Sequence, residues 1–221
     1  MAKLPRVTEE VKDAIYTQIS HFGGVREKAF VKYAAAAVLD ASEETEVNSL
    51  ENLGYKALRA MEREGLVISK MHGPDHVVVP ARDQDSISYD MLDAFEAFVA
   101  LIYENRNEKG SCEFSHALPG DYPFDCMFSI TGSGMYRVIV LNNTAMGRIN
   151  FFNGIKDTAK EFTTLLVISS NYSDEALAEF FAPLEGGNAA ILKGKYRFAV
   201  ISRDRKNFDC QISPVMGDEQ A

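Results

Sequence analysis

Basic and amide side chains in residues 48–72 have the types and the spacing that contact with nucleic acid requires. A helix is expected to begin at Asn48 or Ser49 and to end at Gly65. The polar residues on its outward side are Ser49, Asn52, Tyr55, Lys56, Arg59 and Arg63. Arginine and asparagine fit the edges of guanine and adenine, and lysine fits a phosphate. With Lys70 and His72 on a hairpin that follows, the sequence predicts one surface for duplex DNA.

The same helix also carries acidic residues, which leaves a second interpretation open. Glu51, Glu62 and Glu64 lie among the basic residues. The lysine and the two arginines would then only solvate the outer side of an amphipathic helix. Any DNA-facing surface on this helix must therefore be narrow.

Residues 122–144, YPFDCMFSITGSGMYRVIVLNNT, suggest a different chemistry. They read as two apolar strands around a glycine-rich hairpin, which is similar to the core of metal-dependent nucleases. Such a core holds Mg²⁺ with an aspartate on the first strand and carboxylates on the second. Asp125 fits the first position. The second strand offers only uncharged side chains, Val138, Val140, Asn142 and Asn143. Asp125 is therefore expected to be vestigial, and catalysis would need Asp121 and Glu113 close to it.

No other motif for catalysis, a metal or a cofactor stands out. The chain has no phosphate-binding loop, no dinucleotide-binding glycine motif and no nucleophile elbow. A hairpin could bring His72 and His76 near Asp75, but two solvated turn histidines are the simpler interpretation. We expect no metal, no cofactor and no enzymatic activity.

The elements that must position the basic residues are three helices followed by two strands. Thr8 caps the first helix, which stops at Gly23-Gly24, and a second helix runs from about Val25 to Leu39. After the third helix, LVISKM and HVVVP flank the turn sequence HGPD. This order over residues 5–80 is that of a winged helix-turn-helix, in which the third helix enters the major groove.

The remaining residues alternate between helices and buried strands, which predicts a small α/β domain. Helices are expected from Ser88 to before Gly110, over 145–162 and from Ser173, and strands at 124–130, 136–141, 163–169 and 196–202. The predicted domains are 5–82, the winged helix-turn-helix, and 86–214, an α/β domain resembling a degenerate restriction-endonuclease-like fold. The polar residues 81–86 are a candidate linker. The predicted fold class is α+β or α/β.

Charge, apolar runs and cysteine content argue against several classes of protein. The net charge of −9 argues against non-specific binding of nucleic acid, although it allows a local basic face. No apolar run is long enough to cross a membrane, and the N-terminus does not resemble a signal peptide. The scattered Cys112, Cys126 and Cys210 are expected to be free thiols in the cytoplasm, with Cys126 as a small buried side chain.

Both halves together resemble the replication-relaxation family of plasmids and integrative conjugative elements. The resemblance covers about Val7 to Ser202 and rests on the pattern of elements, on Asp125 in PFDC and on Thr144 after the second strand. Members of this family carry acidic residues at the positions of Val140 and Asn142. The resemblance implies a non-catalytic DNA-binding accessory protein that pairs with itself or with a relaxase or replication protein. The alternatives are a transcriptional regulator whose second domain binds a ligand or a partner, and a protein-interaction module that binds no DNA.

Overall fold

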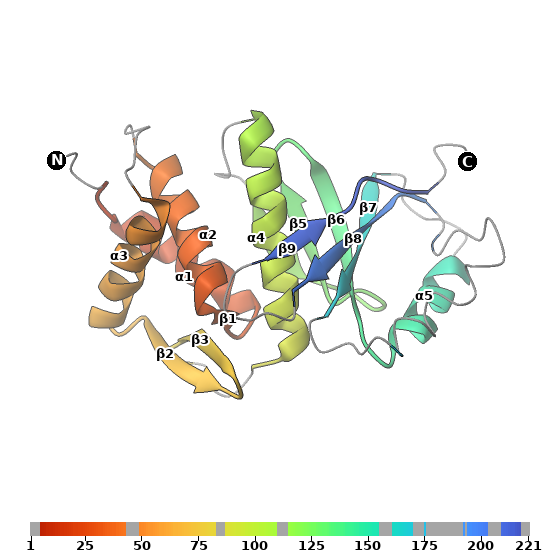
Figure 1. Cartoon of the computed structure of the whole chain (residues 1–221), viewed down its shortest axis with the longest axis horizontal. Helices are drawn as coiled ribbons and strands as arrows, with labels where there is room; N and C mark the ends of the chain where they lie inside the picture. Colours follow the sequence, from red (N-terminus) through yellow and green to blue (C-terminus); the bar gives the residue numbers. More distant parts are fainter. Residues whose placement is uncertain are drawn as a thin grey trace.

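The computed structural model describes residues 5–42, 49–82, 87–109, 115–154, 161–169, 175, 192, 194–202 and 209–217. Its fold class is α+β, with helices and two separate sheets (Figure 1). Residues 83–86 of the predicted linker 81–86 lie outside these residues, and so does the predicted helix that begins at Ser173, except for the single position Glu175. Cys112 and Glu113 also lie outside them.

The first half contains three helices and a three-stranded antiparallel sheet of order β1-β3-β2. Its elements are α1 (Glu9–His21), β1 (Val25–Arg26), α2 (Glu27–Asp40), α3 (Leu50–Arg63), β2 (Val67–His72) and β3 (Asp75–Pro80). The predicted order of helices and strands over residues 5–80 is confirmed. The predicted start of the second helix is wrong, because Val25 and Arg26 pair with β3 and the helix begins at Glu27.

Local chemistry sets the ends of α1 and α3. The Thr8 hydroxyl accepts a hydrogen bond from the backbone N–H of Val11, and the Ser49 hydroxyl accepts one from that of Asn52. Gly23 and Gly65 follow these helices with a positive φ of 68° each, a conformation that favours glycine. These caps and stops are the ones that the sequence predicts.

Helices α2 and α3 pack closely at a glycine inside α3. A Cβ atom added at Gly54 would lie 2.0 Å from the carbonyl oxygen of Val31 in α2. A larger residue at position 54 would therefore force the two helices apart, although alanine favours helix formation more than glycine does. The tight contact fixes which side of α3 faces the core and which side faces outward.

The second half is a six-stranded sheet of order β4-β5-β6-β7-β8-β9, with a helix on each face. Its elements are α4 (Tyr89–Lys109), β4 (His116–Pro119), β5 (Cys126–Ile130), β6 (Gly134–Leu141), α5 (Ala145–Gly154), β7 (Phe162–Ile168), β8 (Tyr196–Ile201) and β9 (Cys210–Ile212). Strands β6, β7 and β8 are parallel, and β4, β5 and β9 extend the sheet in antiparallel register. The predicted helix over 145–162 is too long, because Phe162 already belongs to β7.

Successive side chains of β6 point to opposite faces of the sheet, and each face is covered by a different helix. Val138 and Val140 join the core that includes α4, whereas Ile139 and Leu141 join the core that includes α5. Figure 1 shows α4 between the first half and the sheet, with α5 at the far end.

One continuous core of buried residues connects the two halves. Phe22 at the end of α1 lies 5.0 Å from Phe95 and 6.3 Å from Phe98 of α4, measured between ring centroids. Phe98 in turn lies 5.0 Å from Phe128 of β5. Aromatic packing of this kind joins α1, α4 and the large sheet. Among the described residues, no helix has the length and apolar character needed to cross a membrane.

Candidate nucleic-acid interface

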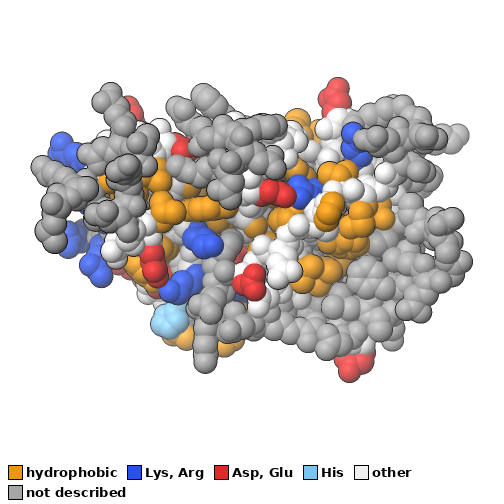
Figure 2. Space-filling view, turned by 45° about the horizontal axis from the view of Figure 1, so that its top comes forward, with side chains coloured by type: hydrophobic (Ala, Val, Ile, Leu, Met, Phe, Trp, Pro, Cys, Tyr) orange, Lys and Arg blue, Asp and Glu red, His pale blue; other side chains and the backbone are white. Residues whose placement is uncertain are grey.

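The outward side of α3 carries a row of polar and basic side chains. Asn52, Lys56, Arg59 and Arg63 are all exposed, and their spacing of four, three and four residues places them on one side of the helix. We call these four residues the α3 row. Lys and Arg side chains project at the end of the molecule where α3 lies (Figure 2). The structure therefore brings four of the predicted DNA-binding residues together.

Two glutamates of α3 and a third at its C-cap are directed away from the α3 row by partners on other elements. The Glu51 carboxylate lies 3.4 Å from Lys28 Nζ of α2, and that of Glu64 lies 2.5 Å from Lys12 Nζ of α1. The Glu62 carboxylate accepts a hydrogen bond from the Ser69 hydroxyl of β2. Because each acid points to a different neighbour, none of them bonds to a cation of the row.

The row contains cations that make no internal contact. Arg59 and Arg63 have no hydrogen-bond or ion-pair partner among the residues that the structure describes, whereas Arg26, Arg148 and Arg197 all bind carboxylates. An exposed arginine of this kind keeps its five donors available for a ligand.

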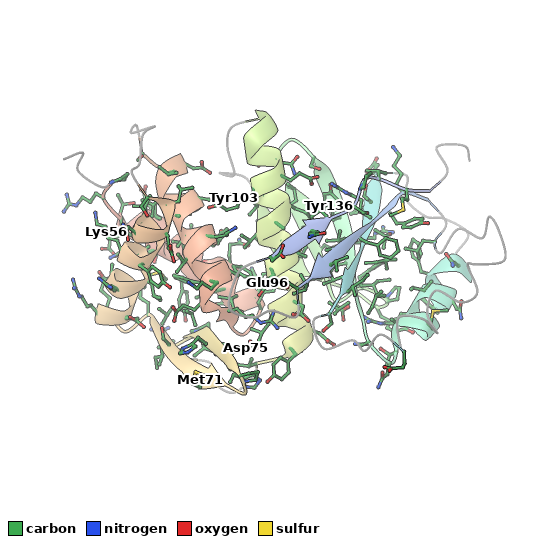
Figure 3. All side chains as sticks on the ribbon, viewed as in Figure 1. Lys56, Met71, Asp75, Glu96, Tyr103 and Tyr136 are labelled. Atoms are coloured by element: carbon green, nitrogen blue, oxygen red, sulfur yellow. The ribbon has the colours of Figure 1, made fainter. Side chains whose placement is uncertain are left out.

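The N-terminal segment lies beside the α3 row and adds one more cation. The Lys56 side chain, labelled in Figure 3, donates a hydrogen bond of 2.7 Å to the carbonyl of Pro5. Pro5 itself is buried. Arg6 follows Pro5 and is exposed, and Val7 packs on the core. The sequence prediction missed Arg6, although a basic residue shortly before the Thr8 cap was a usable signal.

Ser49 is placed differently from the rest of the predicted residues. Its hydroxyl caps α3 by accepting from Asn52 N at 3.2 Å, so it holds the helix N-terminus. It lies at the end of the α3 row, and its side chain has a structural role there.

Lys70 and His72 do not share the surface of the α3 row. Lys70 pairs with Val77, and His72 pairs with Asp75, across the β2–β3 hairpin. This face of the hairpin also carries Val79, and Val77 and Val79 pack on Leu92 of α4. Both side chains are only partly exposed, and the His72 ring lies 4.9 Å from the Tyr89 ring. The opposite face near the turn presents Met71, which is 55% exposed, and the exposed His76.

The histidines of the hairpin form no metal site with Asp75. Asp75 is buried and its carboxylate faces Arg26, with Nε and Oδ2 3.3 Å apart, while His76 points to solvent. Within the described part of the chain, no group of three or more His, Cys, Asp or Glu side chains could hold a metal ion.

Asp125, the predicted vestigial nuclease residue, forms an ion pair with an arginine. Arg148 of α5 donates from Nη1 to Asp125 Oδ2 at 2.7 Å and from Nη2 to the carbonyl of Val140 at 2.6 Å. The same Asp125 oxygen accepts the backbone N–H of Val140 at 2.7 Å. The guanidinium thus takes the cation position next to the carboxylate and ties α5 to β6. Arg148 was not singled out from the sequence.

Asn142 and Thr144, which follow β6, serve the local structure. The Asn142 side-chain oxygen accepts from the Thr144 backbone N–H at 3.0 Å and from its hydroxyl at 2.7 Å, and its amide donates to Asp90 of α4 at 2.8 Å. The free thiols Cys126 and Cys210 agree with the prediction for these two cysteines, and Cys126 is buried.

Comparison of the sequence with protein-family models and with curated proteins found no match in either set.

Proposed function

We propose that the chain binds duplex DNA through the α3 row and does so without catalysis. The observation that carries the proposal is the arrangement of charge on α3. Its glutamates bond to α1, α2 and β2, and Arg59 and Arg63 have no partner among the described residues. Both guanidinium groups are therefore available to the phosphates and base edges of a DNA duplex.

The element order supports a winged helix-turn-helix in the first half, with α3 as the recognition helix and the β2–β3 hairpin as the wing. In this arrangement α3 lies in the major groove. Arg59 and Arg63 reach guanine edges or phosphates, Asn52 reaches an adenine edge, and Lys56 reaches a phosphate. Arg6, beside Lys56, extends the contact along the backbone.

The second half is proposed to be a nuclease-like domain without activity. Its support is the Asp125–Arg148 ion pair, together with the absence of a carboxylate on β6, residues 134–141. With the resemblance to the replication-relaxation family, this favours an accessory protein of a mobile element. A second copy of the chain or a relaxase or replication protein would then dock on the second half.

Fluorescence anisotropy with a labelled duplex at low salt tests the proposal. Arg59→Ala is expected to weaken binding about tenfold, because one charge-assisted contact to DNA is lost. The matched control is Lys195→Ala, which removes an exposed lysine immediately before β8, in the second half, and should leave the affinity unchanged. Equal losses in both variants would mean that only net charge matters, and the proposed interface would be wrong.

A protein-interaction module is the second candidate, and exposed apolar side chains favour it. Leu50 at the start of α3 is 44% exposed and Met71 on the hairpin is 55% exposed. A contiguous patch of such side chains would mark a surface for another protein. If no duplex binds at low salt, this candidate replaces the first.

A further inference from the structure

Helix α5 covers only part of its face of the large sheet. Ile139 and Leu141, in the C-terminal half of β6, are buried in the core that includes α5. Met135 and Arg137 precede them on the same face, because every second residue of a strand points the same way. These two are less covered, since Arg137 is partly exposed and Met135 is 37% exposed. The first half of β6 therefore presents an arginine at the surface of the sheet.

Apolar side chains surround this arginine on the sheet. Met127 of β5 pairs with Arg137, and Leu118 of β4 pairs with Met127, so all three project from one face. Phe162 of β7 pairs with Met135. Leu118 is 36% exposed, and Met127 and Phe162 are half-buried. We call Arg137 and these four apolar neighbours, Leu118, Met127, Met135 and Phe162, the Arg137 patch.

Two aromatic rings hold the guanidinium in place. Arg137 Cζ lies 4.0 Å from the ring centroid of Phe162 and 5.2 Å from that of Phe124. The rings approach from opposite sides of β6, because Phe162 belongs to β7 and Phe124 precedes β5. Contact with a ring uses the flat face of a guanidinium. The N–H donors lie in the plane of the group, so these contacts leave them available.

Arg137 differs from the other partly or fully buried arginines in having no carboxylate. Arg26, Arg148 and Arg197 each bind one or more carboxylates. Arg137 has no hydrogen-bond or ion-pair partner among the residues that the structure describes. Burial lowers the pKa of Arg137 from its ordinary value, and no neighbouring charge opposes this effect. The guanidinium is thus partly desolvated without an anion to compensate it.

We propose that the Arg137 patch is a binding site for a small molecule that carries a carboxylate or phosphate group on an apolar body. The guanidinium fork matches either oxyanion with two parallel hydrogen bonds, and its aromatic neighbours fix the orientation of the fork. Leu118, Met127 and Met135 provide apolar surface for the body of the ligand. The site lies on the second half of the chain, apart from the α3 row, and goes beyond the binding of DNA.

An NMR titration of the full wild-type chain with four small probes tests this site. Benzoate and phenyl phosphate carry both a ring and an oxyanion, acetate carries only the oxyanion, and benzyl alcohol carries only the ring. At constant ionic strength, benzoate or phenyl phosphate should shift the Arg137 Nε–Hε signal and the Met135 methyl signal with a dissociation constant of about 10 mM. The tighter of the two identifies the preferred oxyanion. Acetate and benzyl alcohol should each bind about tenfold more weakly or less, because each lacks one of the two contacts.

The Met135 methyl signal also allows a comparison of variants. Arg137→Gln removes the guanidinium and should weaken benzoate and phenyl phosphate about tenfold, and Arg137→Lys, which keeps the charge without the fork, should not restore the affinity. The matched control Arg82→Gln removes an exposed arginine outside the patch and should bind as the wild type does.

Three results would overturn the proposal. They are no saturable shift with either ring-bearing anion, equal dissociation constants for benzoate and acetate, and equal dissociation constants for the wild type and Arg137→Gln. The first two come from the wild type alone, so they decide the matter even if Arg137→Gln fails to fold. Since no measurement uses DNA, failure here would leave the proposed α3 interface untouched.

Discussion

The arginines of the chain occupy two kinds of place, and the difference separates structure from ligand binding. Arg26 and Arg148 are buried, and each contacts carboxylates that come from other elements. Arg59 and Arg63 lie on the exposed side of α3 and have no partner among the described residues. A buried guanidinium must be paired because its desolvation is costly, whereas an exposed one costs the fold little. The first pair therefore serves the fold, and the second pair remains available to a ligand.

The largest effect is expected for Arg26→Met. The substitution removes the buried guanidinium that Asp75, Asp93 and Glu96 all contact, and we expect a loss of about 4 kcal/mol or more in the free energy of unfolding. Urea unfolding at pH 7.5 measures this loss. The exposed Arg82 supplies the control, and Arg82→Met should stay close to the wild type. A loss below about 1 kcal/mol in Arg26→Met would remove the distinction between the two kinds of arginine.

Arg148→Met should have the next largest effect. It leaves the Asp125 carboxylate, whose side chain is 22% exposed, without its ion-pair partner, and we expect a loss of about 3 kcal/mol. The double variant Asp125→Asn/Arg148→Met removes both charges and should recover part of that loss. If the double variant is less stable than Arg148→Met alone, the ion pair is not what ties α5 to β6.

Ser49→Ala tests a predicted DNA-binding residue that has a structural role. Loss of the hydroxyl leaves the Asn52 N–H without its cap, and we expect a loss of about 1 kcal/mol in the free energy of unfolding. Ser49→Asn also supplies a capping oxygen and should restore most of the stability. Thermal unfolding of the three proteins provides the comparison, and equal midpoints would argue against the cap.

The smallest effect on stability is expected for Arg63→Ala. The side chain is exposed and has no described partner, so the free energy of unfolding should change by no more than about 0.5 kcal/mol. Affinity for duplex DNA should nevertheless fall. A variant that loses more stability than Ser49→Ala would show that Arg63 supports the fold and does not belong to the available pair.

Elements with their own local signals were predictable from the sequence. The caps at Thr8 and Ser49, the glycine stops and the β2–β3 hairpin all depend on residues close together in the chain. Strands β1, β4 and β9, with two, four and three residues, were missed because pairing with other strands defines them. Helix α5 was extended too far because Phe162, which continues the apolar spacing, pairs with Met135 in the sheet.

The α3 row was also predictable, because helical spacing places its residues on one side. The direction of its glutamates was not, since the partner of Glu64 is Lys12, 52 positions away. Arg148 gave no signal either, because its contact with Asp125 depends on how α5 crosses the end of β6. Sequence spacing identifies a face of a helix, but only tertiary contacts decide which charges on it are neutralised.

The salt dependence of DNA binding by the double variant Arg59→Ala/Arg63→Ala tests the central claim most directly. Binding to one duplex is measured by anisotropy over a range of salt concentrations for the wild type, the double variant and Lys195→Ala. We predict weaker binding by the double variant, with a slope of log affinity against log salt that is shallower by about one for each arginine that neutralises a phosphate. We predict no change for Lys195→Ala. Equal affinity and slope for the wild type and the double variant, or no binding by the wild type at low salt, would contradict the account.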